Sequence, residues 1–472
     1  MASDADQGER PAGGTDGATT PEQGADGSLP PYPPNCGPPK LHFVHQMRSP
    51  LAFAEQALAT RDVVRLNELG GGDIFGLGHP DHAKRVLLTE REKFRKTEDF
   101  RIAFGEGLLT VEGEEWGRQR DVLQPLFTRD SVMGYADGMV ETIRRRIDRW
   151  ADGDRLELQA EFTDLALDVL FATVLGRELA LDGDEVIRRS AEDLHGWFEP
   201  TSYFLPEWVP TPARRRFRAA KETIRAEADR LLDAKRGNAP TDPAEAEDLL
   251  SLLVGLREAG VADSAMLTDE RLRDQMVTMI FAGHDTTTTT LTFSFWALAN
   301  NPEIRERFHA EVDALDGPPT LDDLDALEVT ERVVTETLRL YPPVHSLPRE
   351  TTTDVTFDGY RIPADEMVLL ALRHIHRDSR FFDDPETFRP SRWDGDLRSE
   401  LHDFAYAPFG GGPRICIGRQ FALLEAQLAL ATIGRQYDLH WLGENDAHGE
   451  PPVSPEMTLR MEPGQEFLVT ER

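Results

Sequence analysis

Cys416 stands in a stretch whose residue types suit metal chemistry. The stretch reads FGGGPRICIG, from Phe409 to Gly418, and this cysteine is one of only two in 472 residues. Glycines and a proline before it predict a tight loop, and a segment with a helical pattern follows. Such a loop can hold a thiolate against a metal ion while it keeps water and bulky groups away. The alternative interpretation is an inert, buried cysteine.

A second stretch places polar groups inside an apolar helix. The pattern predicts a helix that begins at an N-cap, Thr268, and ends at Asn300–Asn301. Its middle is apolar on all sides, which predicts burial. At the centre lies AGHDTTTTT, Ala282 to Thr290, whose glycine and β-branched threonines are poor helix formers. Because polar groups in a buried helix cost stability, this stretch indicates a functional site; the alternative is a helix-packing cleft with satisfied hydroxyl groups.

Charged side chains at helical spacing supply further candidates. Trp116 and Arg120 are four residues apart, so one helix face presents both, and together they can grip a carboxylate. The alternative is an amphipathic surface helix. Glu336 and Arg339 are three residues apart on another predicted helix, and alone they would be a solvated surface pair. Arg392, in an irregular proline-rich segment, is a candidate partner for a buried carboxylate.

Short strands are predicted on both sides of the long helix. A glycine turn at Gly70–Gly72 separates the first two, and without a GKS or GKT sequence it is interpreted as a turn and not as a phosphate loop. The predicted strands are Val63–Leu66, Asp73–Leu77, 346–350, Val355–Ile362 and Val368–His374, with a final hairpin from Met457 to Val469 around Pro463–Gly464.

The N-terminus differs in composition from the rest. Residues 1–28 contain almost no large apolar groups, so they cannot offset the entropy of ordering. Leu29 to Lys40 reads as a stiff proline hinge. We therefore predict a disordered acidic and proline-rich segment over residues 1–39 and a single folded domain over residues 40–472.

The charge balance is strongly acidic. The chain has 85 Asp and Glu against 52 Lys and Arg, a net charge of −33, and only six of its basic residues are lysines. Such a surface stays soluble and repels nucleic acid. One hypothesis is a halophilic protein of a high-salt cytoplasm; the alternative is a GC-rich genome that favours Arg and Asp codons.

Cysteine usage and hydropathy bear on location. If Cys416 binds a metal, no disulfide remains, which fits a reducing cytoplasm. No secretory signal is expected at the N-terminus. The most apolar long run, Met276 to Ala299, contains His284, Asp285 and five consecutive threonines, which argues against a transmembrane segment.

Several separated segments together resemble the cytochrome P-450 superfamily, the haem-thiolate monooxygenases. The cysteine loop matches the family pattern Phe-x-x-Gly-x-Arg-x-Cys-x-Gly, and AGHDTT matches the oxygen-activating signature of the family's long central helix. Order and spacing agree from about residue 40 to residue 470. The other matching segments are Glu336-x-x-Arg339, Trp116-x-x-x-Arg120 and Phe388-x-Pro390-x-Arg392-Trp393, where Trp393 replaces the commoner Phe.

The resemblance implies the fold and the cofactor. The fold expected is mainly α with small β-sheets (α+β), a triangular helical prism that encloses one haem. The haem is expected to be haem b, iron protoporphyrin IX, with the Cys416 thiolate as axial iron ligand, Phe409 as its shield and Gly418 as the point where the backbone folds under the sulfur. Glu336, Arg339 and Arg392 are expected to form a buried ion network. Further cofactor contacts are expected from Trp116, Arg120, Ala282, Arg349 and Arg414, the basic ones as partners of the haem propionates.

The resemblance also implies the chemistry on the opposite face of the haem. Asp285 and Thr286 look like the acid–alcohol pair that delivers protons during oxygen activation. His284 occupies the family's variable position and is expected to face a neighbouring helix and not the iron. A largely apolar pocket is expected from the central helix and from Phe100–Phe104, Phe204–Trp208 and Val344–Leu347, which indicates a hydrophobic substrate.

The favoured function is therefore a monooxygenase that uses dioxygen to hydroxylate or epoxidise a hydrophobic small molecule. Electrons are expected from a separate ferredoxin or flavodoxin-type donor and its reductase, docked at a basic patch of Arg118, Arg414 and Arg419. Two alternatives are a peroxygenase or isomerase of the same fold and a non-catalytic haem-binding sensor. The intact acid–alcohol pair disfavours both.

Overall fold

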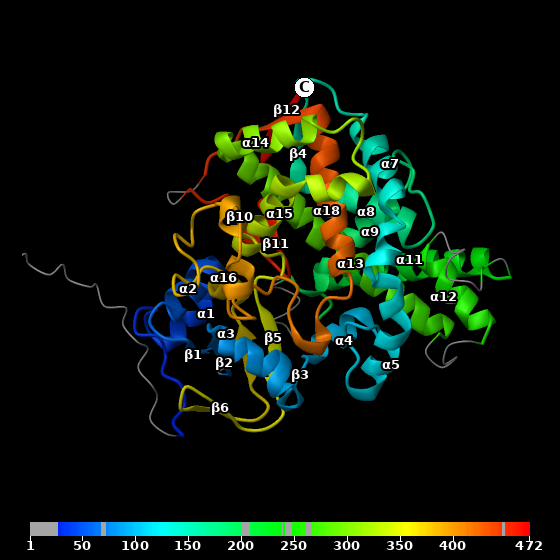
Figure 1. Cartoon of the computed structure of the whole chain (residues 1–472). Coiled ribbons are helices and arrows are strands. Elements are labelled where there is room, and N and C mark those ends of the chain that lie inside the picture. Colours follow the sequence, from blue (N-terminus) through cyan, green and yellow to red (C-terminus); the bar gives the residue numbers. More distant parts are fainter. Residues whose placement is uncertain are drawn as a thin grey trace, which may run out of the picture.

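The computed structural model describes residues 27–67, 72–199, 208–237, 239–240, 248–260, 267–445 and 449–472. Residues 1–26 of the predicted disordered segment, Gly70 and Gly71 of the predicted turn and Phe204–Glu207 of the predicted pocket lie outside these ranges. Within them the chain is mainly helical with small sheets (Figure 1), as predicted.

Helices make up most of the described chain, and one of them, α13 (Asp269–Asn300), runs through the middle of the molecule (Figure 1). The other α-helices are α1 (His42–Arg48), α2 (Pro50–Leu58), α3 (Pro80–Lys84), α4 (Glu98–Phe104), α5 (Gly113–Leu123), α6 (Arg129–Met133), α7 (Ala136–Ile147), α8 (Leu158–Thr173), α9 (Glu185–Asp193), α11 (Pro212–Lys235), α12 (Leu249–Glu258), α14 (Pro302–Asp313), α15 (Glu328–Leu340), α16 (Leu372–His376), α17 (Leu397–Glu400) and α18 (Arg419–Gln436).

Small sheets pack beside the helices. The largest has the order β1-β2-β8-β5-β3, in which β2 and β8 are parallel and the other neighbours are antiparallel. The remaining sheets have the orders β4-β12-β9, β10-β11 and β6-β7. The strands are β1 (Val63–Asn67), β2 (Asp73–Leu77), β3 (Phe94–Arg95), β4 (Arg155–Glu157), β5 (Leu347–Thr351), β6 (Val355–Phe357), β7 (Tyr360–Ile362), β8 (Met367–Leu370), β9 (Tyr437–Trp441), β10 (Val453–Pro455), β11 (Leu459–Met461) and β12 (Glu466–Glu471).

The long central helix has the predicted boundaries. The Thr268 side chain accepts a hydrogen bond from the backbone N–H of Arg271, so it caps the helix as expected. The helix packs against α8, α11, α15 and α18, which explains why most of its residues are buried. It continues without a break through the polar stretch. The hydroxyl groups of Thr286, Thr288, Thr289 and Thr290 donate to the carbonyl four residues earlier, so most of the threonine run is satisfied within the helix.

The described part of the N-terminal segment is packed against the body, which corrects the predicted boundary at residue 39. Cys36 is only 1% exposed and belongs to an apolar cluster with Phe53 and Val64. The Tyr32 hydroxyl donates to Asp73 at 3.1 Å, and the backbone N–H of Arg65 donates to the carbonyl of Pro31 at 3.2 Å. Prolines keep this stretch extended, and its few apolar side chains cover the first strands.

The C-terminal hairpin predicted from Met457 to Val469 does not form. β11 pairs with β10, whereas β12 pairs with β4 and β9, so the turn at Pro463–Gly464 joins two different sheets. Two further strand predictions also need correction. Val355–Ile362 is a hairpin of β6 and β7, and the strand that contains Val368 ends at Leu370 before α16 begins. For the two hairpin regions the apolar alternation was right, but it did not show which strands pair.

No helix in the described ranges is long and apolar enough to cross a membrane.

Candidate active site

The cysteine loop is a turn that depends on glycine. Gly410 and Gly412 have φ angles of 70° and 66°, in the left-handed region that favours glycine. A Cβ on Gly412 would also collide with the carbonyl oxygen of Leu87. The backbone N–H of Cys416 donates to the carbonyl of Phe409 at 3.0 Å and closes the loop. The loop therefore fixes Cys416 just before the start of α18.

The environment of Cys416 favours a thiolate once a cation is present. Its side chain touches solvent-accessible space, yet it lies deep in the molecule, and desolvation raises the pKa of the thiol. The backbone N–H of Gly418 and the guanidinium groups of Arg120 and Arg419 lower the pKa of Cys416, because each stabilises the thiolate. A bound metal ion would complete that stabilisation, since a coordinating thiol is deprotonated.

Gly418 contributes its backbone and not its conformational freedom. Its φ is −81°, which any residue adopts, and a Cβ there would meet nothing within 4 Å. Gly418 is the N-cap of α18, and its N–H faces the Cys416 sulfur.

Three partly buried cations, Lys96, Arg349 and Arg414, lie together where β3, β5 and the cysteine loop meet. Burial, with Arg349 and Arg414 next, holds the pKa of Lys96 well below its usual value. Burial and Arg414 lower the pKa of Arg349 to about 10. The Nη1 of Arg414 has no hydrogen-bond partner among the described residues. Because Glu112 is the carboxylate that partly offsets them, the cluster carries excess positive charge, which indicates a site for an anionic group.

The two candidate residues on α5, Trp116 and Arg120, contact different parts of the site. The Trp116 ring lies 4.9 Å from the Arg414 guanidinium carbon, so it packs on the cation cluster. The Nη1 of Arg120 donates to the carbonyl of Ile415 at 3.0 Å and so lies beside the cysteine. The two residues therefore share a helix face, as predicted, but not one partner.

The sequence did not predict that Lys96 belongs to this cluster. It follows β3 directly, and β3 pairs with β5, so the sheet brings it beside Arg349. The one available signal was its type, because a chain that uses arginine almost everywhere keeps a lysine here.

The predicted ion network is present and fully buried. Glu336 and Arg339 are both 0% exposed and are joined by two hydrogen bonds of 3.0 and 2.9 Å. The Nε of Arg392 donates to the same carboxylate at 2.8 Å, and the Trp393 indole donates at 2.9 Å. This tryptophan therefore supplies a hydrogen bond that a phenylalanine there would lack. The surface-pair alternative for Glu336 and Arg339 is wrong.

On α13, Ala282 and Thr286 form a face that contrasts with the buried helix around it. Ala282 is exposed and Thr286 is partly exposed, whereas Phe281, His284 and Asp285 are buried. The Thr286 hydroxyl donates to the carbonyl of Ala282 at 2.9 Å. One hydroxyl therefore stands on an accessible, otherwise apolar stretch of the helix.

Asp285 points away from that face into a buried polar cluster. It is 0% exposed, and the Nε of Arg460 donates to its Oδ1 at 2.8 Å while the Thr458 hydroxyl donates to Oδ2. Burial alone would raise the pKa of Asp285, but the charge of Arg460 and the hydrogen bond from Thr458 hold it well below its usual range. Asp285 is thus ionised. These partners were not predicted, because nothing in the sequence places the last strands beside the central helix.

His284 faces a neighbouring helix segment and not the accessible face, as expected. Its Nδ1 donates to the carbonyl of Ile280, and its ring lies 6.0 Å from that of His195. His195 belongs to the 3-10 turn Leu194–Trp197, and burial lowers its pKa to about 3. Both imidazoles are therefore neutral.

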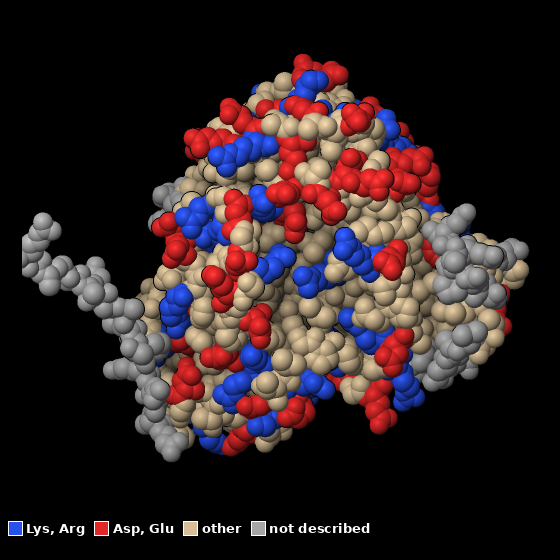
Figure 2. Space-filling view, in the orientation of Figure 1, with Lys and Arg blue, Asp and Glu red and all other residues tan. Residues whose placement is uncertain are grey.

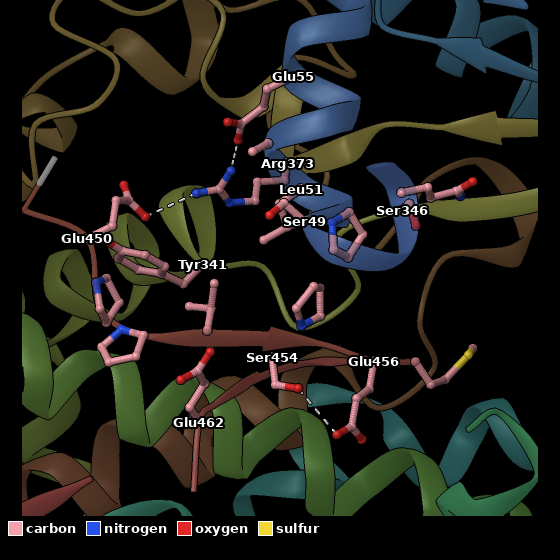
Figure 3. A pocket seen from close by; sticks show the side chains of 18 of the residues that line it. Ser49, Leu51, Glu55, Tyr341, Ser346, Arg373, Glu450, Ser454, Glu456 and Glu462 are labelled. Atoms are coloured by element: carbon pink, nitrogen blue, oxygen red, sulfur yellow. Dashed lines mark hydrogen bonds and ion pairs between the residues drawn. The ribbon is translucent and has the colours of Figure 1, made fainter. Parts of the chain in front are cut away.

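A large cavity reaches this region from the surface. It has a volume of about 1750 Å³ and lies between α2, the strands around Ser346 and the segment that contains β10 (Figure 3). Arg373 stands on its wall between Glu55 and Glu450, with which it forms ion pairs. Phe100 and His195 also line it, whereas Ala282, Thr286 and Cys416 do not.

These observations fit a haem. Cys416 offers a sulfur toward accessible space, and the apolar, accessible face of α13 carries Ala282 and Thr286. The unmatched cations Lys96, Arg349 and Arg414 suit a group with two carboxylates, as a haem has in its propionates.

Comparison with known proteins decides the family. The family model of cytochrome P-450 matches residues 44–467. The chain belongs to the cytochrome P-450 family. It is 34% identical over 408 residues to cyclooctat-9-en-7-ol 5-monooxygenase of Streptomyces melanosporofaciens, which covers 84% of this chain and 87% of that protein. It is also 34% identical over 417 residues to pentalenene oxygenase of Streptomyces avermitilis, with coverage of 86% and 90%.

Solved structures agree with the cytochrome P-450 assignment. The crystal structure of the cytochrome P450DA heme domain has a TM-score of 0.81 at 25% identity and covers 95% of this chain and 98% of that one. The predicted fold class is thus confirmed. Family membership makes this protein a monooxygenase whose cofactor is a haem held by a cysteine thiolate.

A further carboxyl connects the two helices of the cytochrome P-450 site. Glu425 on α18 is 2% exposed and accepts a hydrogen bond from the Thr287 hydroxyl of α13 at 3.2 Å. Its other oxygen has no partner among the described residues. Burial raises the pKa of Glu425 to about 8. The carboxyl is therefore protonated at neutral pH and joins α13 to α18 without charge.

We predict that Glu425→Gln changes the pH dependence of stability. The folded state keeps this proton to about pH 8, whereas the unfolded chain releases it near the ordinary pKa of 4.5. The wild-type protein therefore loses stability as pH rises through that window, by up to about 1.4 kcal/mol per pH unit, and the variant lacks this loss. Urea unfolding of both proteins at several pH values measures it. A stability difference that stays constant from acidic to alkaline pH would contradict the assignment.

We predict that Glu336→Gln destabilises the protein by about 3–5 kcal/mol, because Arg339 and Arg392 keep their buried charge and lose its partner. Glu331→Gln, at an exposed position of the same helix, is the matched control and should change stability by less than about 0.5 kcal/mol. Denaturant unfolding measures both. Equal effects of the two substitutions would show that the network does not support the fold.

Proposed function

We propose that the protein hydroxylates or epoxidises a hydrophobic cyclic hydrocarbon of the terpene class at a haem b held by Cys416. The observation that carries the proposal is that the cysteine loop leads directly into α18, and α18 packs against α13, which carries the Asp285–Thr286 pair. The terpene class is supported by the names of two relatives, which are cyclooctat-9-en-7-ol 5-monooxygenase and pentalenene oxygenase.

The haem, when bound, supplies the iron at which dioxygen is reduced and cleaved, and a thiolate ligand favours that cleavage. The chain holds the cofactor from two sides. Lys96, Arg349 and Arg414 would pair with the propionates, and Trp116 packs on Arg414. The cysteine loop, with Phe409 and the Gly418 N–H, would hold the sulfur in place.

The residues of α13 would handle the protons. The Thr286 hydroxyl stands on the accessible face, where it can hold a proton donor in position. Asp285 is ionised and lies next in the chain, but it is held by Arg460 and Thr458. To carry protons it must leave that ion pair, so Arg460 would set how readily the carboxylate reaches the site.

Phe100 and Phe198 line the large cavity and would form the apolar wall for the substrate. The buried rings of Phe104 and Phe281 pack behind them. The rings of Phe104 and Phe281 lie 4.4 Å apart, and Phe198 lies 5.9 Å from Phe104 and 6.2 Å from Phe281. Phe100, from the predicted pocket segment, lines the large cavity and contacts Phe198 at 5.5 Å. Such a wall binds a rigid hydrocarbon by burial of apolar area and offers few hydrogen bonds.

The alternatives of a peroxygenase or isomerase and of a haem-binding sensor find less support. Neither needs an ionised carboxylate and a hydroxyl adjacent on the central helix, and both groups are present. A monooxygenase needs a reductase and NAD(P)H for turnover, whereas a peroxygenase turns over with peroxide alone. Comparison of the two conditions therefore distinguishes these functions.

An electron donor of the ferredoxin or flavodoxin type would dock on the face that carries the cysteine loop. Figure 2 shows acidic side chains concentrated over the end near α7, α14 and β12, whereas Lys and Arg stand among uncharged residues nearer the loop before α18. Arg118 is exposed, and Arg414 and Arg419 are partly exposed. A local excess of positive charge on an acidic protein would steer an acidic donor to this face. A cytoplasmic location and adaptation to high salt are further parts of the proposal, supported by two free cysteines and a net charge of −33.

We predict that Cys416→Ser abolishes the thiolate-type absorbance of the reduced carbon monoxide complex and the oxygenase activity with it. Serine cannot supply the sulfur ligand, although the loop keeps its backbone hydrogen bonds. Cys36→Ser is the matched control and should keep the spectrum. If the thiolate-type spectrum survives in the Cys416 variant, the proposed ligand is wrong.

We predict that Asp285→Asn lowers coupled turnover by about 10²-fold or more and releases a larger share of the electrons as hydrogen peroxide, because proton delivery fails. Thr288→Val is the control, since its hydroxyl only bonds to the carbonyl of His284 within the helix. Product formed per NAD(P)H consumed, with haem content verified, measures the effect. Unchanged coupling in the Asp285 variant would remove this residue from the reaction.

A further inference from the structure

The buried polar cluster beside the central helix contains three metal-ligating side chains. His195, His284 and Asp285 each offer one ligand atom, and these atoms all lie within 4.8 Å of one another. The Nε2 of His195 is 3.9 Å from Oδ2 of Asp285. The three residues are 7%, 0% and 0% exposed. No part of the proposed oxygenase reaction requires the two histidines.

Three of the four imidazole nitrogens of these histidines lack a hydrogen-bond partner among the described residues. His284 uses Nδ1 for the carbonyl of Ile280, which fixes its tautomer and leaves a lone pair on Nε2. That Nε2 has no partner among the described residues, and neither ring nitrogen of His195 has one. Buried polar atoms are rarely left unpaired, so these atoms indicate a bound ion or water.

The surrounding hydrogen bonds resemble the support that metal ligands receive. A metal-binding histidine commonly donates its other N–H to a backbone carbonyl, as His284 does to Ile280. Ligating carboxylates are themselves hydrogen-bonded, and Asp285 accepts from Arg460 on Oδ1 and from Thr458 on Oδ2. Oδ2 is also the oxygen that faces His195.

The charge of Arg460 does not exclude a cation. Glu192 and Glu456 lie close enough to interact electrostatically with both Arg460 and Asp285. Both glutamates are exposed, and together with Asp285 they make the negative charge near Arg460 exceed the positive charge, which favours a bound cation. An entry route also exists, because His195 and Glu456 both line the large cavity, where Figure 3 shows Glu456 on the wall.

We propose that His195, His284 and Asp285 form a binding site for a divalent transition-metal ion with the preferences of Zn²⁺. Two imidazoles and one carboxylate are ligands that zinc takes, and a fourth position remains for water. Zinc–ligand bonds of about 2.0–2.2 Å place tetrahedral ligand atoms roughly 3.3 Å apart, so small side-chain movements close the site around the ion.

Occupation of the site would affect the reaction. A metal ion on Asp285 holds the carboxylate in the cluster and so competes with its role in proton delivery. This consequence rests on the proposed function, whereas metal binding itself does not. Zinc is therefore expected to inhibit coupled turnover without a change in the haem spectrum.

Titration of the full-length, haem-loaded protein with Zn²⁺ after chelator treatment tests the site by calorimetry. We expect one ion per chain in the wild type. His195→Phe, which keeps an aromatic ring against Phe281 and removes both nitrogens, should weaken binding at least about tenfold, and so should His284→Gln. His440→Gln, a half-exposed histidine beside Asp438, is the matched control and should bind as the wild type does.

Anomalous diffraction at the zinc edge places the ion in the wild-type protein without any substitution. A peak between the three side chains supports the proposal. A water molecule there in zinc-containing crystals, binding only at surface histidines, or unchanged affinity in His195→Phe would overturn it. If His284→Gln is unstable, the His195 variant decides, because the His195 side chain makes no hydrogen bond to the described residues that the substitution would break. An intact carbon monoxide spectrum beside a failed zinc titration would refute this site and leave the proposed oxygenase standing.

Discussion

One buried carboxylate, that of Glu336, holds the segment that leads to the cysteine loop in place. Glu336 accepts hydrogen bonds from Arg339, Arg392, Trp393 and the backbone N–H of Arg389, and it has no exposure to water. Arg339 in turn donates to the carbonyls of His376 and Pro385. These bonds connect α15 to an irregular, proline-rich segment that forms no ladder of its own. Because a buried charge without its partner is costly, the segment that leads to the cysteine loop has one stable position.

Polar groups with and without partners distinguish the structural network from the candidate ligand sites. Around Glu336 the carboxylate and backbone carbonyls accept hydrogen bonds from both guanidinium groups, which makes the network rigid. Around Lys96, Arg349 and Arg414 positive charge exceeds negative charge, and an anionic cofactor would restore the balance. Around Asp285 the protein supplies an ion pair, yet two neutral imidazoles keep unused lone pairs. Excess charge or unpaired nitrogen inside a well-packed fold therefore marks the places where a ligand is expected.

The sequence predicted many local elements of this structure, but it did not predict which distant elements pack together. The central helix and its cap at Thr268 were predicted because helical spacing and capping residues act over a few positions. The Glu336 network was expected only from the family resemblance, since spacing alone indicated a surface pair. The C-terminal hairpin was wrong, since alternation shows a strand without its neighbour. Lys96, His195 and Arg460 escaped prediction for the same reason: each reaches its site through packing of distant elements. The packed stretch around Cys36 shows that composition alone underestimates order near a terminus.

The pairing of Asp285 with Thr458 and Arg460 also bears on biosynthesis. A ribosome completes the central helix long before it adds the strand that carries these two partners, more than 170 residues later. Until then the Asp285 carboxylate has no cationic partner, and its burial is unfavourable. The middle of α13 must therefore stay hydrated or be shielded by other proteins. Closure of the interior is thereby tied to the emergence of residues 458–460 from the ribosome. The buried polar cluster of the central helix becomes complete only after these residues have been added.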